Sequence, residues 1–399
     1  MLIISINAGS SSLKWQLFQM PAKKVIAKGM IDRLGTEQAE FKVSYGQGQK
    51  FKQTEAILTK ESAATLVLTR LKSLKIVEHL EAIKGVGHRV VSGGEVFDRS
   101  TVIDDHVLLQ IENFSELAPL HNRTEAYFVR VFRDLLPQAC QVAVFDNAFF
   151  AHLDPINYLY PIDKKYYDQY QVRKYGAHGT SHRYVTLRAA ELLDKPVTET
   201  SLITLHLGSG ASVSAIKSGQ ALDTSMGFTP LAGIMMGTRS GDIDPSIIPY
   251  IMEKEHLTDV REVIKALNNQ SGLLGVSGLS NDKRDIDAAA AAGNQRAQLA
   301  QEMFNNRIVK YVGSYWALLG KTPDALIFTA GIGENDQGVR LAVGQALAHL
   351  GVKIDPQAND MRGQERLIST PDSQVKVYVI PTNEELMIAQ DTYDLTAKE

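Results

Sequence analysis

The chain of 399 residues has a single cysteine and no large excess of charge of either sign. Its single cysteine, Cys140, excludes an intramolecular disulfide and any zinc or iron–sulfur site built from several cysteines. Lys and Arg number 42 against 45 Asp and Glu, which leaves a net charge of −3. General binding to nucleic acid requires a basic surface that displaces counterions, so we expect no nucleic-acid partner.

Long hydrophobic runs are also missing. The N-terminus, Met1-Leu2-Ile3-Ile4-Ser5-Ile6, has no basic flank and is too short for the apolar region of a signal peptide. No stretch of about 18 apolar residues occurs in the chain. Together with the single cysteine, this predicts a cytoplasmic protein without a membrane segment.

The familiar phosphate and cofactor motifs are absent as well. Leu319-Gly320-Lys321-Thr322 ends like a P-loop, but Tyr315 stands five positions before Gly320, where that loop needs glycine. No Gly-x-Gly-x-x-Gly in a dinucleotide-fold context, His-Glu-x-x-His or Gly-x-Ser-x-Gly pattern is found. A bound nucleotide would therefore require another architecture.

What the sequence does contain is an alternation of short apolar strands and helices, which predicts an α/β protein. Residues 2–6 read as a buried strand, and Leu13, Trp15 and Leu17 alternate with polar neighbours as a second strand that folds back on the first. Apolar residues at helical spacing predict a long helix over 295–319, ended by Gly320. The length favours two domains.

One internal similarity suggests that the two halves share a plan. The segments 4–12 and 205–213 both read as strand, glycine–serine turn and strand, and Gly9 and Gly210 are 201 positions apart. Two such halves would place their small-residue turns facing each other across a cleft. The alternative is a chance similarity of two hairpins.

The glycine-rich turns are candidate anion sites, because backbone N–H groups are accessible where no Cβ blocks the approach. The first turn is followed by Lys14, and the second is Gly208-Ser209-Gly210. A third, Thr329 to Asn335, follows the strand 325–328 and would let a base or ribose lie against the backbone at a helix N-terminus. Each alone is typical of a plain hairpin, but three at strand ends favour a nucleotide.

Dense polar clusters separate these turns. Arg89 precedes Gly93-Gly94, and Arg239 stands between Gly237 and Gly241, where tight backbone turns can aim a side chain at a ligand. Arginines and a histidine donor suit phosphoryl transfer, whose transition state spreads negative charge over oxygens, better than hydrolysis. His178 and His182 have metal-ligand spacing, but Gly179 makes a helix there doubtful, and a satisfied structural histidine is the favoured interpretation of His182.

Motifs along nearly the whole chain resemble the acetate kinase family, within the acetate and sugar kinase, actin and heat-shock ATPase superfamily. They include Asn7-Ala-Gly-Ser-Ser-Ser-Leu-Lys14, Gly-His-Arg89-Val-Val, Tyr-Gly-Ala-His178-Gly-Thr-Ser-His, His206-Leu-Gly-Ser-Gly-Ala-Ser, Met-Gly-Thr-Arg239-Ser-Gly-Asp, Gly331-Ile-Gly-Glu-Asn335 and Pro-Thr-Asn-Glu384. The resemblance implies an α/β fold of two domains with a duplicated actin-like (ribonuclease H-like) core and the active-site cleft between them. It places the domains at 1–150 with 386–399, and at 151–385.

The resemblance also implies reversible, direct in-line transfer of the ATP γ-phosphoryl group to acetate, with Mg²⁺ or Mn²⁺, in a homodimer. Arg89 matches the carboxylate-binding arginine, and Arg239 and His178 the groups that stabilise the transferring phosphoryl group. Asp146 matches the residue usually described as the catalytic acid/base. Because acetate is already ionised at neutral pH, we interpret Asp146 as an orienting group instead.

The remaining implied positions fall into three sets. The metal positions are Asn7 and Glu384. The acyl-pocket positions are Val91, Leu120, Ala177 and Pro230. The positions that contact ATP or ADP are Lys14, His206, Leu207, Gly208, Ser209, Gly210, Asp282, Lys283, Arg284, Gly331, Ile332, Gly333, Glu334 and Asn335.

Some positions depart from the family pattern. Ser92, Ser209 and Arg123 replace the usual histidine, asparagine and proline, and Ala177 stands where the family has an aromatic ring. Removing the ring would leave room for propionate or butyrate, and each buried methylene is worth about 0.8 kcal/mol. The alternative is that a neighbouring side chain fills the space.

Two other functions are open on this architecture: a nucleotide-driven binding or assembly protein and a phosphatase. The first predicts slow ATP hydrolysis without acetate and no role for Arg89. The second requires a carboxylate poised to activate water. The two arginines favour a kinase, because a carboxylate substrate needs them and a water molecule does not.

Overall fold

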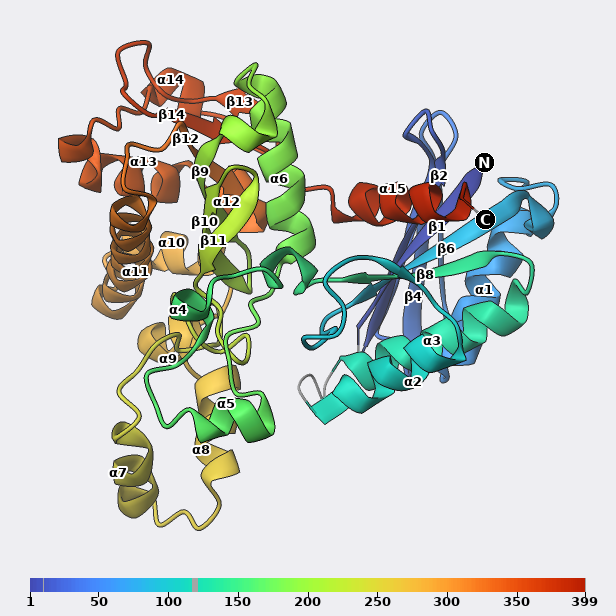
Figure 1. Ribbon diagram of the computed structural model, residues 1–399, viewed down its shortest axis with the longest axis horizontal. Helices are drawn as coiled ribbons and strands as arrows, with labels where there is room; N and C mark the ends of the chain where they lie inside the picture. Colours follow the sequence, from blue (N-terminus) through green and yellow to red (C-terminus); the bar gives the residue numbers. More distant parts are fainter. Residues whose placement is uncertain (10, 117–120, 399) are drawn as a thin grey trace. The chain divides into compact units, whose positions relative to one another are not determined.

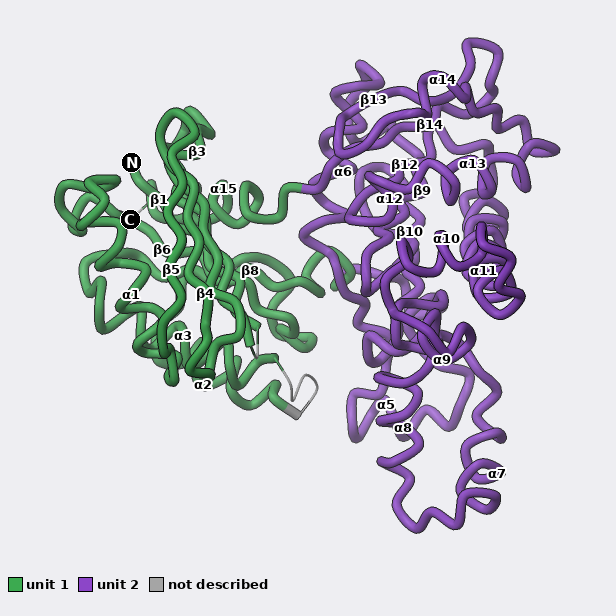
Figure 2. The backbone as a smooth tube through the Cα atoms, turned by 180° about the vertical axis from the view of Figure 1, so that it is seen from behind, with its two compact units in different colours: residues 1–151, 383–399 green, residues 152–382 purple. Residues whose placement is uncertain are grey.

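The structure is a computed structural model, and it describes residues 1–9, 11–116 and 121–398. The chain forms two compact units (Figure 2). Unit 1 comprises Met1–Ala151 and Asn383–Glu399, and unit 2 comprises His152–Thr382. Among the helices in the described residues, none combines the length and the hydrophobicity needed to cross a bilayer.

Unit 1 is built on an eight-stranded sheet in the order β5-β4-β3-β2-β1-β6-β8-β7 (Figure 1). Strands β1 to β5 are antiparallel neighbours, whereas β6 and β8 run parallel to β1. The strands are β1 (Leu2–Ala8), β2 (Ser12–Gln19), β3 (Lys24–Asp32), β4 (Thr36–Tyr45), β5 (Gln49–Ile57), β6 (Ile83–Val90), β7 (Thr101–Val102) and β8 (Cys140–Phe145).

Unit 2 is built on a six-stranded sheet in the order β11-β10-β9-β12-β14-β13. Strands β9, β10 and β11 are antiparallel neighbours, and β12 and β14 run parallel to β9. The strands are β9 (Ser201–Leu207), β10 (Ala211–Lys217), β11 (Gln220–Thr224), β12 (Ala325–Thr329), β13 (Arg366–Leu367) and β14 (Lys376–Val379).

The two sheets share one topology. The order β3-β2-β1-β6-β8 in unit 1 corresponds to β11-β10-β9-β12-β14 in unit 2, with the same parallel and antiparallel pairings. Each series ends at a two-residue antiparallel edge strand, β7 or β13. The repeated hairpins of the sequence are thus β1/β2 and β9/β10, and the predicted duplicated core is confirmed.

Helices cover both faces of the unit 1 sheet. They are α1 (Lys60–Ser73), α2 (Asp105–Asn113), α3 (Asn122–Leu135) and α15 (Glu384–Thr396), with short 3₁₀ helices at Leu80–Ala82, Phe114–Glu116 and Ala148–Phe150. Phe128 of α3 shares a core cluster with Ile4 of β1, whereas Ala389 of α15 packs with Ile3. Because successive strand residues point to opposite faces, α3 and α15 lie on opposite sides of this sheet.

Helix α15 packs closely on its face because the facing strand has no side chains in the way. A Cβ at Gly87 of β6 would lie 2.2 Å from the Thr392 hydroxyl oxygen, and one at Gly85 would lie 2.8 Å from the Thr392 methyl carbon. The last helix of the chain therefore belongs to unit 1, beside β1, β6 and β8 (Figure 1).

Unit 2 contains the other helices. They are α4 (Pro155–Tyr158), α5 (Lys165–Tyr170), α6 (Gly179–Leu192), α7 (Ile247–Lys254), α8 (Val260–Asn269), α9 (Gly272–Ser277), α10 (Lys283–Ala291), α11 (Gln295–Leu319), α12 (Ala330–Asn335), α13 (Gln337–Ala346) and α14 (Pro356–Asn359), with 3₁₀ helices at Val197–Glu199 and Ala348–Leu350. The predicted long helix is α11, and Gly320 ends it in the left-handed conformation. Helix α6 packs on β9 and β12 of the unit 2 sheet.

Two local predictions are wrong. A helix does run past Gly179, because His178 takes a left-handed conformation (φ 61°) and α6 starts after it, so the glycine lies at the helix end, not in its interior. The segment after β12 is the short helix α12, not an open turn. Gly333 lets α12 approach β12, since a Cβ there would lie 3.3 Å from the carbonyl carbon of Phe328.

Candidate active site

In unit 1, three polar residues stand at the carboxyl ends of adjacent parallel strands. Asn7 lies near the end of β1, Arg89 near the end of β6, and Asp146 directly after β8. These ends meet at one edge of the sheet, on the face that α15 covers, and Glu384 is the first residue of α15. The fold thus gathers residues that are far apart in the sequence.

Arg89 is the centre of this cluster. Its Nη2 donates a hydrogen bond to Asp146 Oδ2 at 2.5 Å, and its Nη1 lies 3.5 Å from Asn7 Oδ1. Burial alone would lower the pKa of Arg89, but the charges of Asp146, Glu384 and Glu125 outweigh burial and raise it. The buried Nε has no hydrogen-bond partner among the described residues. The guanidinium is therefore charged and held in place by Asp146 and Asn7.

Two further carboxyl groups interact electrostatically with this arginine. Glu125 of α3 is 2% exposed, its Oε2 accepts a hydrogen bond from Val91 N at 3.0 Å, and burial raises the pKa of Glu125 to about 8. Burial, together with the charge of Asp146, raises the pKa of Glu384 above its usual range. Val91 is half-buried beside the cluster, and Leu120 lies outside the described residues.

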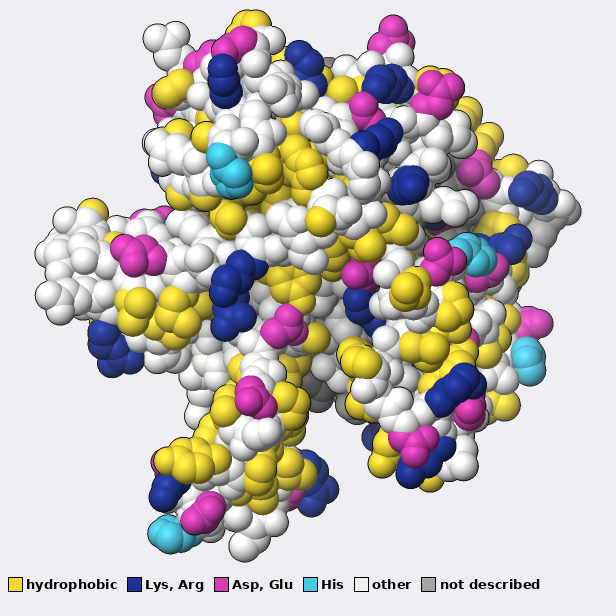
Figure 3. All heavy atoms as spheres, turned by 60° about the vertical axis from the view of Figure 1, so that its left-hand side comes forward, with side chains coloured by type: hydrophobic (Ala, Val, Ile, Leu, Met, Phe, Trp, Pro, Cys, Tyr) yellow, Lys and Arg dark blue, Asp and Glu magenta, His cyan; other side chains and the backbone are white. Residues whose placement is uncertain are grey.

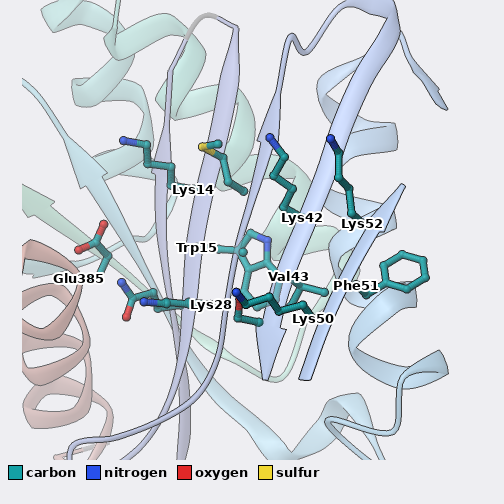
Figure 4. A pocket seen from close by; sticks show the side chains of 13 residues that line it. Lys14, Trp15, Lys28, Lys42, Val43, Lys50, Phe51, Lys52 and Glu385 are labelled. Carbon is teal, nitrogen blue, oxygen red and sulfur yellow. The ribbon is translucent and has the colours of Figure 1, made fainter. Parts of the chain in front are cut away.

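Lys14 stands directly opposite Asn7 in the β1/β2 ladder, so the two side chains leave the same face of the sheet. It also borders a hollow of about 450 Å³ whose other lysines are Lys28, Lys42, Lys50 and Lys52 (Figure 4). Two of these lysines, Lys42 and Lys52, form ion pairs with Glu40. Among the predicted site residues that the structure describes, Lys14 is the only one that lines this hollow.

In unit 2, three histidines gather where α6 begins beside β9. The rings of His178 and His206 are stacked, with centroids 4.0 Å apart and planes at 19°. His182 is fully buried, and both of its ring nitrogens are hydrogen-bonded, to Thr204 Oγ1 at 2.7 Å and to Ser212 Oγ at 2.8 Å. The prediction that His182 is a satisfied structural histidine is confirmed.

The Arg239 side chain also reaches the region of His178. A methyl group at Gly210 would lie 3.5 Å from His178 Nε2 and 3.6 Å from Arg239 Nη1, so both groups flank this glycine. Nη1 of Arg239 donates to the carbonyl oxygen of Pro230 at 3.2 Å, and burial lowers the pKa of Arg239. Within the described ranges Arg239 forms no ion pair, so its charge is not neutralised by the protein.

A hollow of about 890 Å³ lies beside the glycine turn of unit 2. Eight of the predicted nucleotide contacts line it: Gly208, Ser209, Asp282, Lys283, Arg284, Gly331, Ile332 and Asn335. Of the remaining six, Lys14 lies in unit 1, and His206, Leu207, Gly210, Gly333 and Glu334 do not line this hollow. Leu207 and Gly333 are buried in the core, and Glu334 Oε1 accepts a hydrogen bond from Thr382 N at 3.0 Å.

Two charged residues of this hollow have structural partners. The side chain of Lys283 is only 4% exposed and bonds to Asp287 and to Asp336 Oδ2. Asp282 caps α10 through the backbone N–H of Arg284, and it also forms an ion pair with the exposed Arg284 side chain. The Lys283 ammonium therefore holds two carboxylates together at the wall of the hollow.

The acyl-pocket position Ala177 is 5% exposed and belongs to the core cluster of unit 2. Its methyl group packs against the protein interior. Pro230 is half-buried and contacts Arg239 through its carbonyl oxygen. The ring that the family usually has at position 177 is therefore replaced by a packed methyl group.

Sequence reasoning missed two groups that touch these clusters. Ser212 bridges His178 and His182; it is the last residue of the motif that begins at His206, but the motif alone gives it no role. Glu125 could have been found from the sequence. It lies on the same helical stripe as Phe128, Val129 and Phe132, and an acidic residue on such an apolar stripe is expected to be buried.

A metal ion would find oxygen donors in unit 1. Asn7 supplies an amide oxygen and Glu384 a carboxylate whose raised pKa reflects burial beside Asp146. Hard cations such as Mg²⁺ prefer oxygen ligands and need only one or two carboxylates when phosphates complete the shell. The described residues contain no group of three or more His, Cys, Asp or Glu side chains placed to hold a metal by themselves. The donors fit Mg²⁺ bound together with a phosphate.

Comparisons with known proteins show the family to which the chain belongs. The model of the acetokinase family matches residues 2–390. Acetate kinase 1 of Latilactobacillus sakei subsp. sakei (strain 23K) is 57% identical over 393 residues, which cover 98% of this chain and 99% of that relative.

Solved structures of similar proteins have the same fold. The crystal structure of Porphyromonas gingivalis acetate kinase has a TM-score of 0.93 and 42% identity, and covers 99% of both chains. A propionate kinase from Francisella tularensis subsp. tularensis SCHU S4 has a TM-score of 0.92 and 39% identity, and covers 98% of this chain and 99% of that chain.

Proposed function

The chain belongs to the acetokinase family, and we propose that it is an acetate kinase. It transfers the γ-phosphoryl group of ATP reversibly to acetate and forms acetyl phosphate and ADP. The observation that carries this proposal is Arg239, a half-buried guanidinium with no ion-pair partner in the described part of the chain. A buried charge without a partner is costly, so a ligand of opposite charge is its natural complement.

Arg89 binds the carboxylate of acetate. An arginine holds a carboxylate through parallel N–H donors, and Arg89 has an Nε donor without a partner among the described residues. Asp146 orients this guanidinium through its hydrogen bond to Nη2. Acetate is ionised at neutral pH, so no base has to remove a proton before its oxygen attacks the phosphorus.

Unit 2 binds the nucleotide and stabilises the transferring group. The hollow beside Gly208, Ser209 and Gly331 receives ATP, and Arg239 and His178 donate hydrogen bonds to the phosphoryl oxygens. Charge builds on these oxygens in the transition state, so fixed donors lower the barrier. The transfer is in line and direct, and no side chain is phosphorylated.

Asn7 and Glu384 would hold Mg²⁺, or Mn²⁺ in its place, together with ATP. The bound ion would supply positive charge beside the phosphate oxygens. Glu384 must be ionised to hold a cation, and its raised pKa predicts that the metal binds more weakly below neutral pH.

Acetate is the proposed substrate, and propionate or butyrate is the alternative. The packed Ala177 methyl group gives no sign of extra room in the described residues. A pocket commonly discriminates by about 1–3 kcal/mol per methylene. We therefore expect kcat/KM for propionate to be about tenfold or more below that for acetate, and a ratio near one would favour the alternative.

We also propose a homodimer in the cytoplasm. Exposed apolar side chains occur on α7 (Ile247, Tyr250) and α8 (Val260, Ile264). Hydrophobic side chains are visible on the lobe that lies lowest in Figure 3. An apolar surface of this kind is typical of a contact between subunits. Sedimentation velocity at micromolar concentration tests the dimer, and a species of 43.9 kDa would contradict it.

The activity is tested by initial rates of ADP formation from Mg-ATP, with and without acetate, while hydroxylamine traps acyl phosphate. One acetyl hydroxamate per ADP supports the kinase. ADP without hydroxamate would indicate an ATPase of the assembly-protein type and would overturn the proposal.

A further inference from the structure

A serine links two histidines of unit 2. Ser212 Oγ lies 2.9 Å from His178 Nδ1 and 2.8 Å from His182 Nε2. On the far side of the His182 ring, Nδ1 lies 2.7 Å from Thr204 Oγ1. Thr204, His182, Ser212 and His178 thus form a continuous chain of hydrogen bonds.

Few hydrogen atoms are available to this series of hydrogen bonds. The Ser212 hydroxyl has one hydrogen, so it can donate to one histidine and must accept from the other. His182 is fully buried, and burial lowers its pKa well below the usual value, so its ring is neutral and has one N–H. Only two arrangements satisfy every bond.

In the first arrangement, Thr204 donates to His182 Nδ1, and His182 Nε2–H donates to Ser212. Ser212 then donates to His178 Nδ1, so a neutral His178 has its proton on Nε2. In the second, every bond is reversed, and a neutral His178 has its proton on Nδ1 and a bare Nε2. The two arrangements therefore place opposite groups at the end of the chain.

The distances around Thr204 favour the first arrangement. In the second, the Thr204 hydrogen must find another acceptor, and the one available is the Ser214 carbonyl oxygen at 3.5 Å. Hydroxyl hydrogen bonds have a mode of about 2.7–2.8 Å, as in the 2.7 Å contact to His182. The Thr204 hydroxyl therefore donates its hydrogen bond to His182 Nδ1.

We propose that Ser212 is a positioning residue that keeps His178 neutral with its proton on Nε2. This nitrogen faces the Gly210 turn, as Nη1 of Arg239 does. Phosphoryl oxygens only accept hydrogen bonds, so a bare Nε2 would repel them and an Nε2–H attracts them. The inference rests on the proposed phosphoryl transfer and adds how its histidine donor is prepared.

Ser212→Ala tests the inference, and Ser214→Ala is the matched control. Both serines are fully buried on β10 and leave the same face, but Ser214 bonds to Thr224 Oγ1 and to no histidine. Loss of one donor in a catalytic site costs about 10²–10³ in kcat. We expect Ser212→Ala to lower kcat by about 10- to 100-fold with KM values within about threefold, and Ser214→Ala to leave kcat unchanged.

Nitrogen-15 NMR of the histidines reports directly which ring nitrogen of each histidine has the proton. The His178 signal is assigned by its loss in His178→Asn. We expect Nε2–H with a bare Nδ1 in the intact enzyme, and a mixture of both forms in Ser212→Ala.

Two results would overturn the inference: an intact enzyme whose His178 has its proton on Nδ1 or on both nitrogens, and a Ser212→Ala variant with unchanged kcat. A failure of the proposed function is distinguishable, because the intact enzyme would then form no acetyl hydroxamate.

Discussion

Replacing Arg239 separates the function of a buried charge from its effect on stability. In unit 2 its Nη1 has one conventional hydrogen bond, to Pro230 O at 3.2 Å, and a long contact of 3.7 Å to Met236 Sδ. It has no ion pair within the described residues, and burial disfavours its charged form. The protein therefore gains little folding stability from this guanidinium.

The expected effects of Arg239→Ala follow from this balance. The lost hydrogen bond is worth about 1 kcal/mol, and removing an unpaired buried charge offsets it, so unfolding free energy should change by less than about 1 kcal/mol. An arginine that stabilises a phosphoryl transition state is worth about 10³–10⁵ in turnover. At 1.36 kcal/mol per decade that is about 4–7 kcal/mol.

Arg340 provides the contrast in stability. It is fully buried, but its guanidinium donates to Asn359 Oδ1, to the Gly333 carbonyl oxygen and to the carbonyl oxygens of Asn359 and Met361. Arg340→Ala leaves these acceptors unpaired and opens a cavity, so we expect a loss of about 3–5 kcal/mol.

The assay combines kcat for acetyl hydroxamate formation with urea unfolding of both variants. The reasoning predicts a stable, nearly inactive Arg239→Ala and an unstable Arg340→Ala. A turnover loss below about tenfold in Arg239→Ala would refute the assigned role. So would a loss of stability comparable to that of Arg340→Ala.

Three further substitutions test other parts of the site. Gly210→Ala should fold, because the contacts of the added methyl group are 3.5 Å or longer. It should lower kcat at least tenfold, because the methyl group occupies the space between His178 and Arg239. Gly313→Ala, whose methyl group would have no described neighbour within 4 Å beyond the adjoining helix residues, is the control and should leave kcat unchanged. Equal activities of the two variants would contradict the placement of the site beside Gly210. The pKa of Glu125 is raised to about 8, so this group contributes stability at low pH that is lost as the pH rises through 8. Glu125→Gln removes this contribution, and its Tm should fall less with rising pH than the Tm of the intact protein. Parallel curves of Tm against pH for the two proteins would contradict this. Asp146→Asn should raise KM for acetate and leave the pH profile of kcat unchanged, because Asp146 orients Arg89; loss of a titration step in kcat would instead indicate a base.

Much of the fold could be predicted because it depends on local patterns. Apolar spacing and a terminal glycine sufficed for α11, and the glycine–serine turns at a spacing of 201 residues predicted the duplicated hairpins. The errors at Gly179 and in α12 share a cause. In a local pattern glycine indicates a helix break or a turn, whereas here it lies at a helix end or lets a helix approach a strand.

The sites depend on contacts that no local pattern contains. Asn7, Arg89, Asp146 and Glu384 come together only because three parallel strands end at one edge and the last helix of the chain returns to that sheet. Ser212 and Ser214 both lie between apolar residues on β10, and only the placement of α6 gives Ser212 two histidine partners. Such roles follow from packing.

The central claim is that an oxygen of acetate attacks the γ-phosphorus of ATP. The most direct measurement is phosphorus-31 NMR of the products formed from Mg-ATP and acetate labelled with oxygen-18 in both carboxylate positions. The account predicts acetyl phosphate whose phosphorus signal has the isotope shift of one bridging oxygen-18. Inorganic phosphate as the sole phosphate product besides ADP, or acetyl phosphate without that shift, would contradict it.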